Sequence, residues 1–342
     1  MTRTSITAEP TLPAAHGPLS TAVRRALTGP ASGDHLARIG ASVRDSDPYG
    51  LDLQLALCMC YELHYRGFAG VDPAWEWNPA LLHLRGELEH VFLAGVRRDV
   101  GPVTPDQTSA TEKEAISVEP IDDSVGTGPS YYLRDNGTSQ QVREYFAHRS
   151  LYHLKEGDPH AWAIPRLMGR AKAAFVAVEF DEYGAGQAPR LHQQLFADLL
   201  AAAGLDATYL GYLDAVPAES LAVVNLMSLF GLHRSLRGAA VGHFASTEIT
   251  SPPGSRRMVQ ALQRMNAPSA CIGFYSEHVE ADAVHEQVVR IDVVGDLIAR
   301  EPQLDRDVVF GMRAHAAVEN CLADKIMAAW QQGQTSLRRP LD

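Results

Sequence analysis

The sequence contains few cysteines, and their spacing does not organise a small fold. The four cysteines include no Cys-x-x-Cys pair; they are Cys58, Cys60, Cys271 and Cys321. This pattern excludes a disulfide framework and argues against a zinc knuckle. We expect free thiols, buried in a protein of the reducing cytoplasm.

Long apolar runs and an excess of basic residues are also missing. No 18 consecutive residues are apolar, and residues 1–20 lack the apolar segment of a secretory signal. The chain has 41 acidic and 30 basic residues, which give a net charge of −11. This charge disfavours binding to nucleic acid or to an anionic membrane surface. We therefore expect a cytoplasmic protein with neither of these partners.

Patterns typical of β-strands are nearly absent, whereas apolar residues recur at helical spacing. In 190–204, for example, Leu191, Leu195 and Leu199 fall on one helical face, and Gly204 is suited to end the helix. The predicted fold class is therefore all-α, a bundle of long buried helices. The helices are expected at 51–63, 78–98, 139–154, 164–184, 190–204, 219–249, 255–266, 270–294 and 305–330.

Changes in composition divide the chain. Residues 104–130 are rich in Pro, Gly, Ser, Thr and acidic residues, which is typical of a linker or long loop. The apolar segment 51–63, with Trp75 and Trp77 nearby, is expected to pack on the main domain or to form a homodimer interface. The expected segments are a disordered tail at 1–20, an N-terminal helical extension at 21–103, the linker or long loop at 104–130, the main domain at 131–333 and a C-terminal tail at 334–342.

Potential metal ligands are concentrated in residues 277–287, EHVEADAVHEQ. On a helix with about 100° per residue, His278, Asp282 and His285 share a stripe about 60° wide. This spacing lets one helix present several ligands to one site, and imidazole with carboxylate suits iron, manganese or zinc. Because histidines on a charged face are often simply hydrated, further ligands must come from other helices.

The ferritin-like arrangement, in which two helices each carry Glu-x-x-His, is not supported. The sequence has one such pair, Glu87 and His90, and no second. We therefore expect Glu87 and His90 to lie on an exposed helix face.

Other carboxylates suit a buried site better. Glycines and Pro189 interrupt the helical pattern between Glu182 and His192, so the chain can fold these two side chains together. Glu248 lies deep in an apolar segment, where a carboxylate is costly unless it is paired or bound to metal. Glu156 closes another helical segment.

Taken in order, these residues resemble the heme-oxygenase-like di-iron oxidases and oxygenases. The resemblance covers about residues 135–330 and implies a heme-oxygenase-like helical bundle. The family spacing, Glu-x9-His, selects Glu182 over its neighbours Glu179 and Asp181. The implied metal ligands are Glu156, Glu182, His192, Glu248, His278, Asp282 and His285.

The resemblance also implies chemistry. Four carboxylates balance the charge of two Fe(II) ions, and O2 is the co-substrate. An amino acid or amine substrate is expected, with N-oxygenation in natural-product biosynthesis favoured over C–C cleavage or desaturation of an amino or fatty acid. An external electron donor is compatible with this. A substrate carboxylate could pair with an arginine, although surface ion pairs are the alternative for each candidate: Arg234, Arg237, Arg256 and Arg257.

Three alternatives stay open. A heme oxygenase of the same fold would need one proximal histidine, and a thiaminase-like enzyme would need Cys271 as nucleophile. A helical protein could also bind metal without catalysis. Other nearby side chains are interpreted as structural or hydrated: His153, His160, His233, His243, Glu277, Glu280 and Glu286.

Overall fold

The structure is a computed structural model that describes residues 9–31, 36, 40–104 and 126–341, with the side chains of 40–41 and 280–284 left out. These residues form helices and no strand, which confirms the all-α prediction. The α-helices are α1 (Pro18–Leu27), α2 (Gly40–Arg44), α3 (Leu51–Glu62), α4 (Pro79–Val100), α6 (Pro129–Asp135), α7 (Ser139–His153), α8 (Asp158–Ala161), α9 (Gly169–Glu182), α10 (His192–Ala202), α11 (Ala218–Leu232), α12 (Arg237–Arg264), α13 (Ser269–Val288), α14 (Asp296–Arg300) and α15 (Asp305–Gln331).

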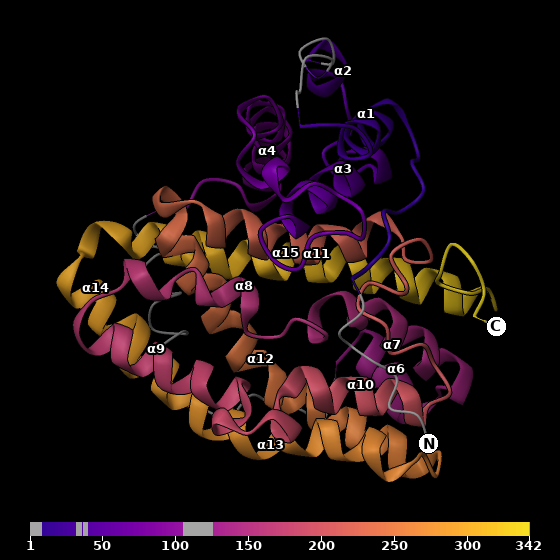
Figure 1. Cartoon of the computed structure of the whole chain (residues 1–342). Helices are drawn as coiled ribbons and strands as arrows, with labels where there is room; N and C mark the ends of the chain where they lie inside the picture. Colours follow the sequence, from indigo (N-terminus) through magenta and orange to yellow (C-terminus); the bar gives the residue numbers. More distant parts are fainter. Residues whose placement is uncertain (1–8, 32–35, 37–39, 105–125, 342) are drawn as a thin grey trace.

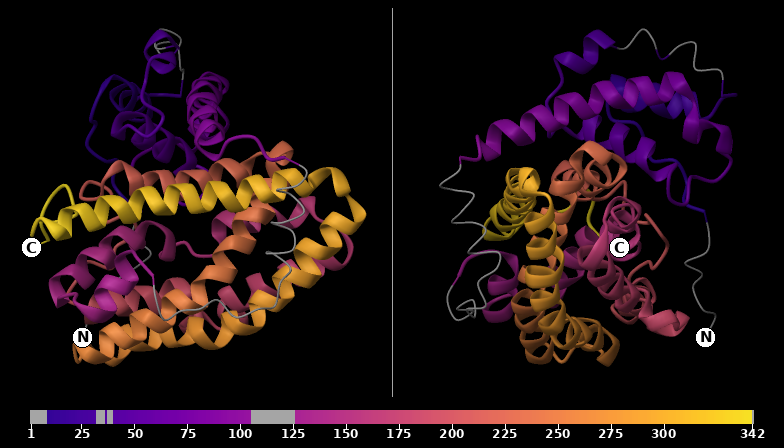
Figure 2. Two further views of the ribbon diagram at one scale, coloured as in Figure 1. Left: turned by 180° about the vertical axis from the view of Figure 1, so that it is seen from behind. Right: turned by 90° about the vertical axis from the view of Figure 1, so that its left-hand side faces the viewer.

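The N-terminal helices cover one side of the bundle. Figure 1 shows α1 to α4 above α11 and α15, with α13 on the opposite side and α12 running between them, and Figure 2 shows the same layering from two further directions. α3 packs on α11, and α4 packs on α15. One hydrophobic cluster runs from Leu53 and Trp75 in the extension to Phe230 in α11 and Trp330 in α15. The extension therefore packs on the main domain, which is the first of the two arrangements expected from the sequence.

The apolar segment 219–249 is not one helix, so that prediction is wrong. The chain breaks at His233, whose φ of −103° and ψ of 111° are extended, and a new helix begins at Arg237. The guanidinium of Arg166 donates hydrogen bonds to the carbonyls of Gly231 and Leu232, which closes the end of α11. α12 then continues through Pro252 and Pro253, where we had expected a boundary between two helices.

Glycines bring the backbones of α12 and α15 into direct contact. A Cβ atom on Gly242 would lie 1.9 Å from the carbonyl oxygen of Val308, and one on Gly311 would lie 2.1 Å from that of Ala239. Only a residue without a side chain fits at either position. This close contact fixes the position of α12 along α15, and with it the position of Glu248, which lies further along α12.

The two ends of the described chain are packed rather than loose. The N–H of Ala69 donates to the carbonyl of Pro10, and α1 begins at Pro18, within the stretch for which we expected a disordered tail. In the expected C-terminal tail, Ser336 is buried and donates two hydrogen bonds to Glu144 Oε2. Of the expected linker, residues 105–125 lie outside the described part.

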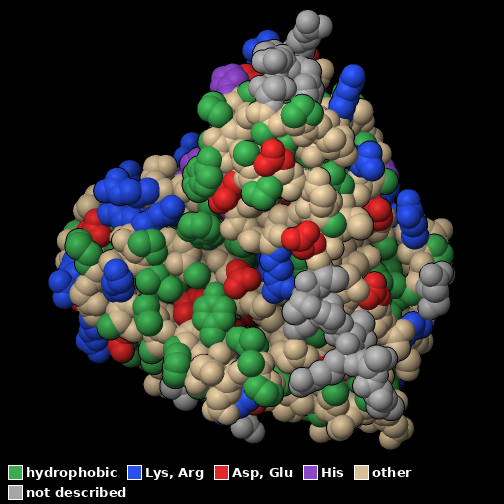
Figure 3. Space-filling view, in the orientation of Figure 1, with side chains coloured by type: hydrophobic (Ala, Val, Ile, Leu, Met, Phe, Trp, Pro, Cys, Tyr) green, Lys and Arg blue, Asp and Glu red, His purple; other side chains and the backbone are tan. Residues whose placement is uncertain are grey.

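The surface carries charges of both signs. On the face shown in Figure 3, Lys and Arg side chains gather at the left-hand edge, where Figure 1 has α9 and α14, and acidic side chains are scattered elsewhere. Within the described residues, no helix is both long and apolar enough to cross a membrane. Three cysteines are buried as expected, whereas Cys321 is exposed.

Candidate metal centre

Six of the seven expected ligands lie together in the interior. They come from separate elements, because Glu156 follows α7, Glu182 ends α9, His192 begins α10 and Glu248 lies within α12. His278 and His285 lie two turns apart on α13. All six are buried. The side chain of the seventh, Asp282, lies outside the described residues.

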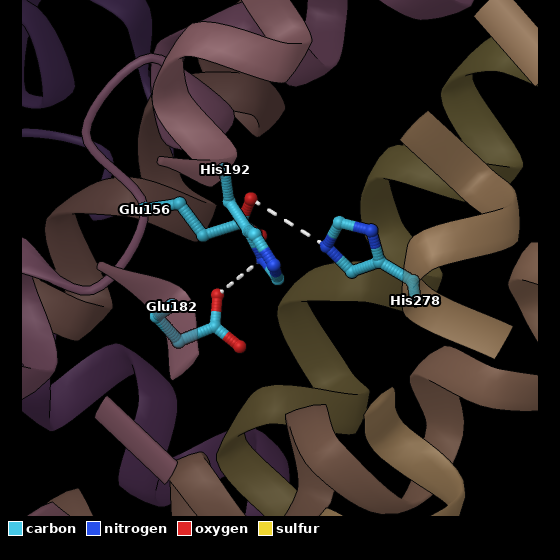
Figure 4. A group of neighbouring side chains, drawn as sticks. All are labelled: Glu156, Glu182, His192 and His278. Carbon is cyan, nitrogen blue, oxygen red and sulfur yellow. Dashed lines mark ion pairs between the residues drawn. The ribbon is translucent and has the colours of Figure 1, made fainter. Parts of the chain in front are cut away.

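The first group contains four side chains. Glu156, Glu182, His192 and His278 each offer one ligand atom, and these atoms all lie within 4.8 Å of one another. Figure 4 shows them pointing toward a common centre. His192 Nδ1 lies 2.7 Å from Glu182 Oε2, and His278 Nε2 lies 3.6 Å from Glu156 Oε2. Two imidazoles and two carboxylates of this kind suit iron or manganese.

The second group adjoins the first and shares one carboxylate with it. Glu182, Glu248 and His285 also offer atoms within 4.8 Å of one another. His285 Nδ1 lies 3.3 Å from Glu248 Oε2 and 4.0 Å from Glu182 Oε1. Because Glu182 belongs to both groups, the arrangement fits two neighbouring cations with one carboxylate between them.

A glycine turn brings Glu182 and His192 together. Gly184 has a φ of +65°, and a Cβ atom there would lie 2.5 Å from the carbonyl carbon of Arg190. The chain after α9 can therefore turn back tightly to start α10. The expected interruption of the helix between Glu182 and His192 is confirmed.

Hydrogen bonds orient the two imidazoles of α13. His278 Nδ1 contacts the carbonyl oxygen of Phe274 at 2.8 Å, so this nitrogen carries the proton and Nε2 turns toward Glu156. His285 Nε2 contacts Asp181 Oδ2 at 3.1 Å, which leaves Nδ1 toward Glu248. An outer partner of this kind is typical of histidines that bind metal.

Several buried polar atoms of the first group lack a hydrogen bond. Among the described residues, Glu156 Oε2, Glu182 Oε2 and His192 Nδ1 make no hydrogen bond, although Glu182 Oε2 and His192 Nδ1 form an ion pair at 2.7 Å. Native proteins seldom leave such atoms unsatisfied, and a cation at the centre would satisfy all three. The donor set therefore fits a metal ion.

The charges of the site shift several pKa values. Burial alone would raise the pKa of Glu156, but His153 and His278 hold it well below its usual value. Burial alone would lower the pKa of His192, but Glu182 raises it. Burial, and then the charges of Glu182 and Glu248, raises the pKa of Glu179 well above its usual value.

Glu179 is the one rival carboxylate that lies deep in the interior beside the two groups. It is 2 % exposed, and neither carboxylate oxygen has a hydrogen bond to a described residue. It nevertheless belongs to neither group. Asp181, the other rival, is half-exposed and contacts the outer side of His285.

Most of the other histidines and glutamates that the sequence offered contact residues outside the two ligand groups. His233 contacts Glu89 at 2.9 Å, and His243 contacts His160 at 3.3 Å. On α4, far from the site in sequence, His90 is exposed as expected. Glu277 and Glu286 form outer ion pairs with Arg190 and Arg290, and the side chain of Glu280 lies outside the described residues.

A cavity of about 360 Å³ reaches the first group. Glu156, His153 and His278 line it on the side of the metal centre. Serine and threonine residues of α12 line it as well; these are Ser246, Thr247, Thr250, Ser251 and Ser255. Of the four candidate arginines, Arg257 lines the cavity, and its Nε donates to Ser130 Oγ at 2.9 Å.

Comparison with known proteins identifies the class. A family of iron-containing redox enzymes matches residues 143–320, and the chain belongs to this family. The match includes all seven expected ligands. The structure and the family together confirm the heme-oxygenase-like fold, and they make the protein an oxidoreductase of an iron-containing family.

The chain is also similar to a protein of named activity. The chain is 23 % identical over 191 residues to a nitrosourea synthase of Streptomyces achromogenes subsp. streptozoticus. The matched part is 54 % of this chain and 40 % of the relative. The chain thus spans less than half the length of that protein.

Sequence reasoning missed the residues that orient the ligands. His153 was interpreted as structural, yet its Nδ1 lies 2.7 Å from Glu156 Oε1. Its position three residues before Glu156, at the end of a helix, is a local pattern that could have revealed it. The pairing of His285 with Asp181 joins residues 104 positions apart, and no local pattern indicates it.

Proposed function

We propose that this chain is a non-heme di-iron oxygenase or oxidase that acts on an amino acid or amine. The observation that carries the proposal is the pair of buried ligand groups that share Glu182. Glu156, Glu182, His192 and His278 would hold one iron. Glu182, Glu248 and His285 would hold the other, with Asp282 added from the sequence pattern. When bound, the two irons supply the electrons that activate O2.

N-oxygenation is the favoured reaction. For a primary amine it balances as R–NH2 + O2 + two electrons + two protons → R–NHOH + H2O, so an external electron donor is required. The relative is named for making a nitrosourea, a compound that contains an oxidised nitrogen. C–C cleavage and desaturation use the same ligands and stay alternatives.

The cavity supports a polar substrate. The charged and polar side chains of Arg257, Glu319 and Asn320 line it together with residues of the metal centre. They offer hydrogen-bond donors and acceptors to an amino acid or amine. The walls orient the substrate beside Glu156 and His278 and limit the entry of water.

The alternatives from the same fold are less well supported. Burial raises the pKa of Cys271 to about 11, and its Sγ contacts the carbonyl of Leu199, so it is unsuited to act as a thiolate nucleophile. A heme enzyme would use one histidine and would leave the carboxylate groups without a role. A metal-binding protein without catalysis would bind iron but consume no O2.

The test is anaerobic loading with Fe(II), followed by mixing with O2 in a stopped-flow spectrophotometer in the presence of single amino acids. We expect about two irons per chain and a transient visible band that one amino acid shortens. Less than one iron per chain and no band would contradict the proposal. Iron binding without any O2 consumption would establish the non-catalytic alternative.

Replacing Glu248 gives a sharper result. In Glu248→Ala we expect the helical fold to persist, the iron content to fall from about two to about one and turnover to be abolished, because the second group loses a carboxylate. Glu277→Ala, on the outer side of α13, is the matched control and should keep both irons. Full activity in Glu248→Ala would refute the di-iron assignment.

A cytoplasmic location and a homodimer stay predictions. The mass of the chain is 37.2 kDa. A light-scattering mass near that value would contradict the homodimer.

A further inference from the structure

The extension reaches the metal centre through a buried ion pair. Glu62, the last residue of α3, is 1 % exposed and binds the ammonium of Lys155, which is equally buried. Tyr209 OH donates to the other oxygen of Glu62 at 2.6 Å, and the ring of Tyr65 lies 4.5 Å from Lys155 Nζ. Lys155 directly precedes Glu156, so the backbone that carries this ligand is fixed from the side of the extension.

A second contact from the extension holds the segment that carries His192. Arg66 donates to the carbonyl of Leu154 at 3.1 Å and to Gln193 Oε1 at 2.7 Å. Gln193 Nε2 in turn donates to the carbonyl of Glu156 at 3.0 Å. Arg66 and Gln193 therefore tie the turn that carries Glu156 to the first turn of α10, where His192 lies.

We propose that Glu62 and Arg66 are positioning residues for the metal centre, and that the N-terminal extension is thus part of the site. This inference rests on the proposed metal-binding function. Neither residue belongs to either ligand group; they set the distance between Glu156 and His192 through Lys155 and Gln193. Outer partners of metal ligands typically change metal affinity by roughly 10–100-fold.

The extension offers a matched control. Glu89 on α4 is also buried, and it pairs with Arg85 in the extension and with His233 at the end of α11. Like Glu62, it joins the extension to the bundle, here through the partly exposed His233. Unlike Glu62, it pairs with no described residue that adjoins a ligand.

The experiment measures Fe(II) affinity of the metal-free full-length chain by anaerobic competition with a chromogenic chelator, together with thermal unfolding by circular dichroism. We expect Glu62→Gln to lower the affinity of the tighter iron by roughly 10–100-fold. Glu89→Gln should lower the melting temperature and leave the affinity within about twofold of wild type. A milder variant, Tyr209→Phe, removes only the hydrogen bond to Glu62 and should weaken iron binding several-fold. If Glu62→Gln does not fold, the iron affinity of Tyr209→Phe tests the inference in its place.

Three outcomes are decisive. Unchanged affinity in both Glu62→Gln and Tyr209→Phe, with two irons still bound by wild type, would overturn this inference alone. Equal losses of affinity in Glu62→Gln and Glu89→Gln would also overturn it, because the effect would then be one of general stability. A wild-type chain that binds no Fe(II) would overturn the proposed function as well.

Discussion

Two buried polar networks adjoin α7, and they are satisfied in opposite ways. Near its start, Glu144 Oε2 accepts hydrogen bonds from Trp330 Nε1 and from the N–H and hydroxyl of Ser336, at 2.8–2.9 Å. Beyond its end, Glu156 Oε2 and Glu182 Oε2 have no hydrogen bond to any described residue. The first network is complete within the protein, whereas the second would be completed by the proposed metal ions.

The histidines repeat the contrast. Both ring nitrogens of His148 contact hydroxyl groups, those of Ser220 at 2.8 Å and Ser336 at 2.9 Å. His192 instead pairs its Nδ1 with a carboxylate, Glu182 Oε2 at 2.7 Å, which belongs to the same ligand group. Burial depth is similar for His148 and His192, so the kind of partner, hydroxyl groups for one and a buried carboxylate for the other, separates a structural histidine from a candidate ligand here.

The largest effect should come from removing the acceptor of the complete network. In Glu144→Ala, three buried donors lose their partner, and we expect the free energy of unfolding to fall by roughly 3 kcal/mol or more. Urea denaturation followed by circular dichroism measures this, and iron content should stay at the wild-type value. A stable variant, or one that loses iron, would break the comparison between the two networks.

The second-largest expected effect is a loss of stability at acid pH, through His148 in the complete network. Burial lowers the pKa of His148 to about 3, from a usual value of 6.5. The folded state therefore binds fewer protons than the unfolded state between these two values. Its contribution to stability is intact above pH 6.5 and is lost as pH falls toward 3, by about 1.4 kcal/mol per pH unit.

Urea titrations at pH 7, 6 and 5 test this dependence. His148→Gln should be less stable at pH 7, and its stability should depend less steeply on pH. An identical slope in wild type and variant would show that His148 does not contribute to acid sensitivity.

The smallest expected effect is a gain in stability. It concerns Glu179, which lies beside the incomplete network. Glu179 is a buried carboxyl group without a hydrogen bond, close to like charges. In Glu179→Gln we expect the metal-free protein to gain about 1–2 kcal/mol, because a neutral amide costs less to bury. The gain should shrink once iron is loaded, since the metal offsets the negative charge. Destabilisation of the metal-free variant would mean that Glu179 is already satisfied.

Local sequence pattern predicted most helices and the types of candidate ligand residue. It failed where contacts between residues far apart in the sequence determine the structure. Stripes of apolar residues placed α10 and α15 correctly, because the period of a helix is written in adjacent residues. The break at His233 was missed because the group that closes α11 is Arg166, which lies 65 residues before its partner Gly231. The prolines of α12 suggested a boundary that the surrounding packing overrides.

The candidate site shows the same division. Spacing within α13 indicated His278 and His285, and the glycines around Gly184 together with the family spacing indicated Glu182 and His192, since each depends on one turn or one helix. The role of Glu62 could not be anticipated. Its partner Lys155 lies 93 residues away, and a buried ion pair across that distance has no local signature.

The contact between α12 and α15 has a practical consequence for mutational scanning of this protein. Gly242 and Gly311 carry no functional group, yet any side chain there would drive a backbone carbonyl of the opposite helix away. A scan that scores loss of activity would place both glycines beside Glu248 in rank. Intolerance to substitution would then mark the contact between α12 and α15, which positions Glu248, as strongly as it marks Glu248 itself.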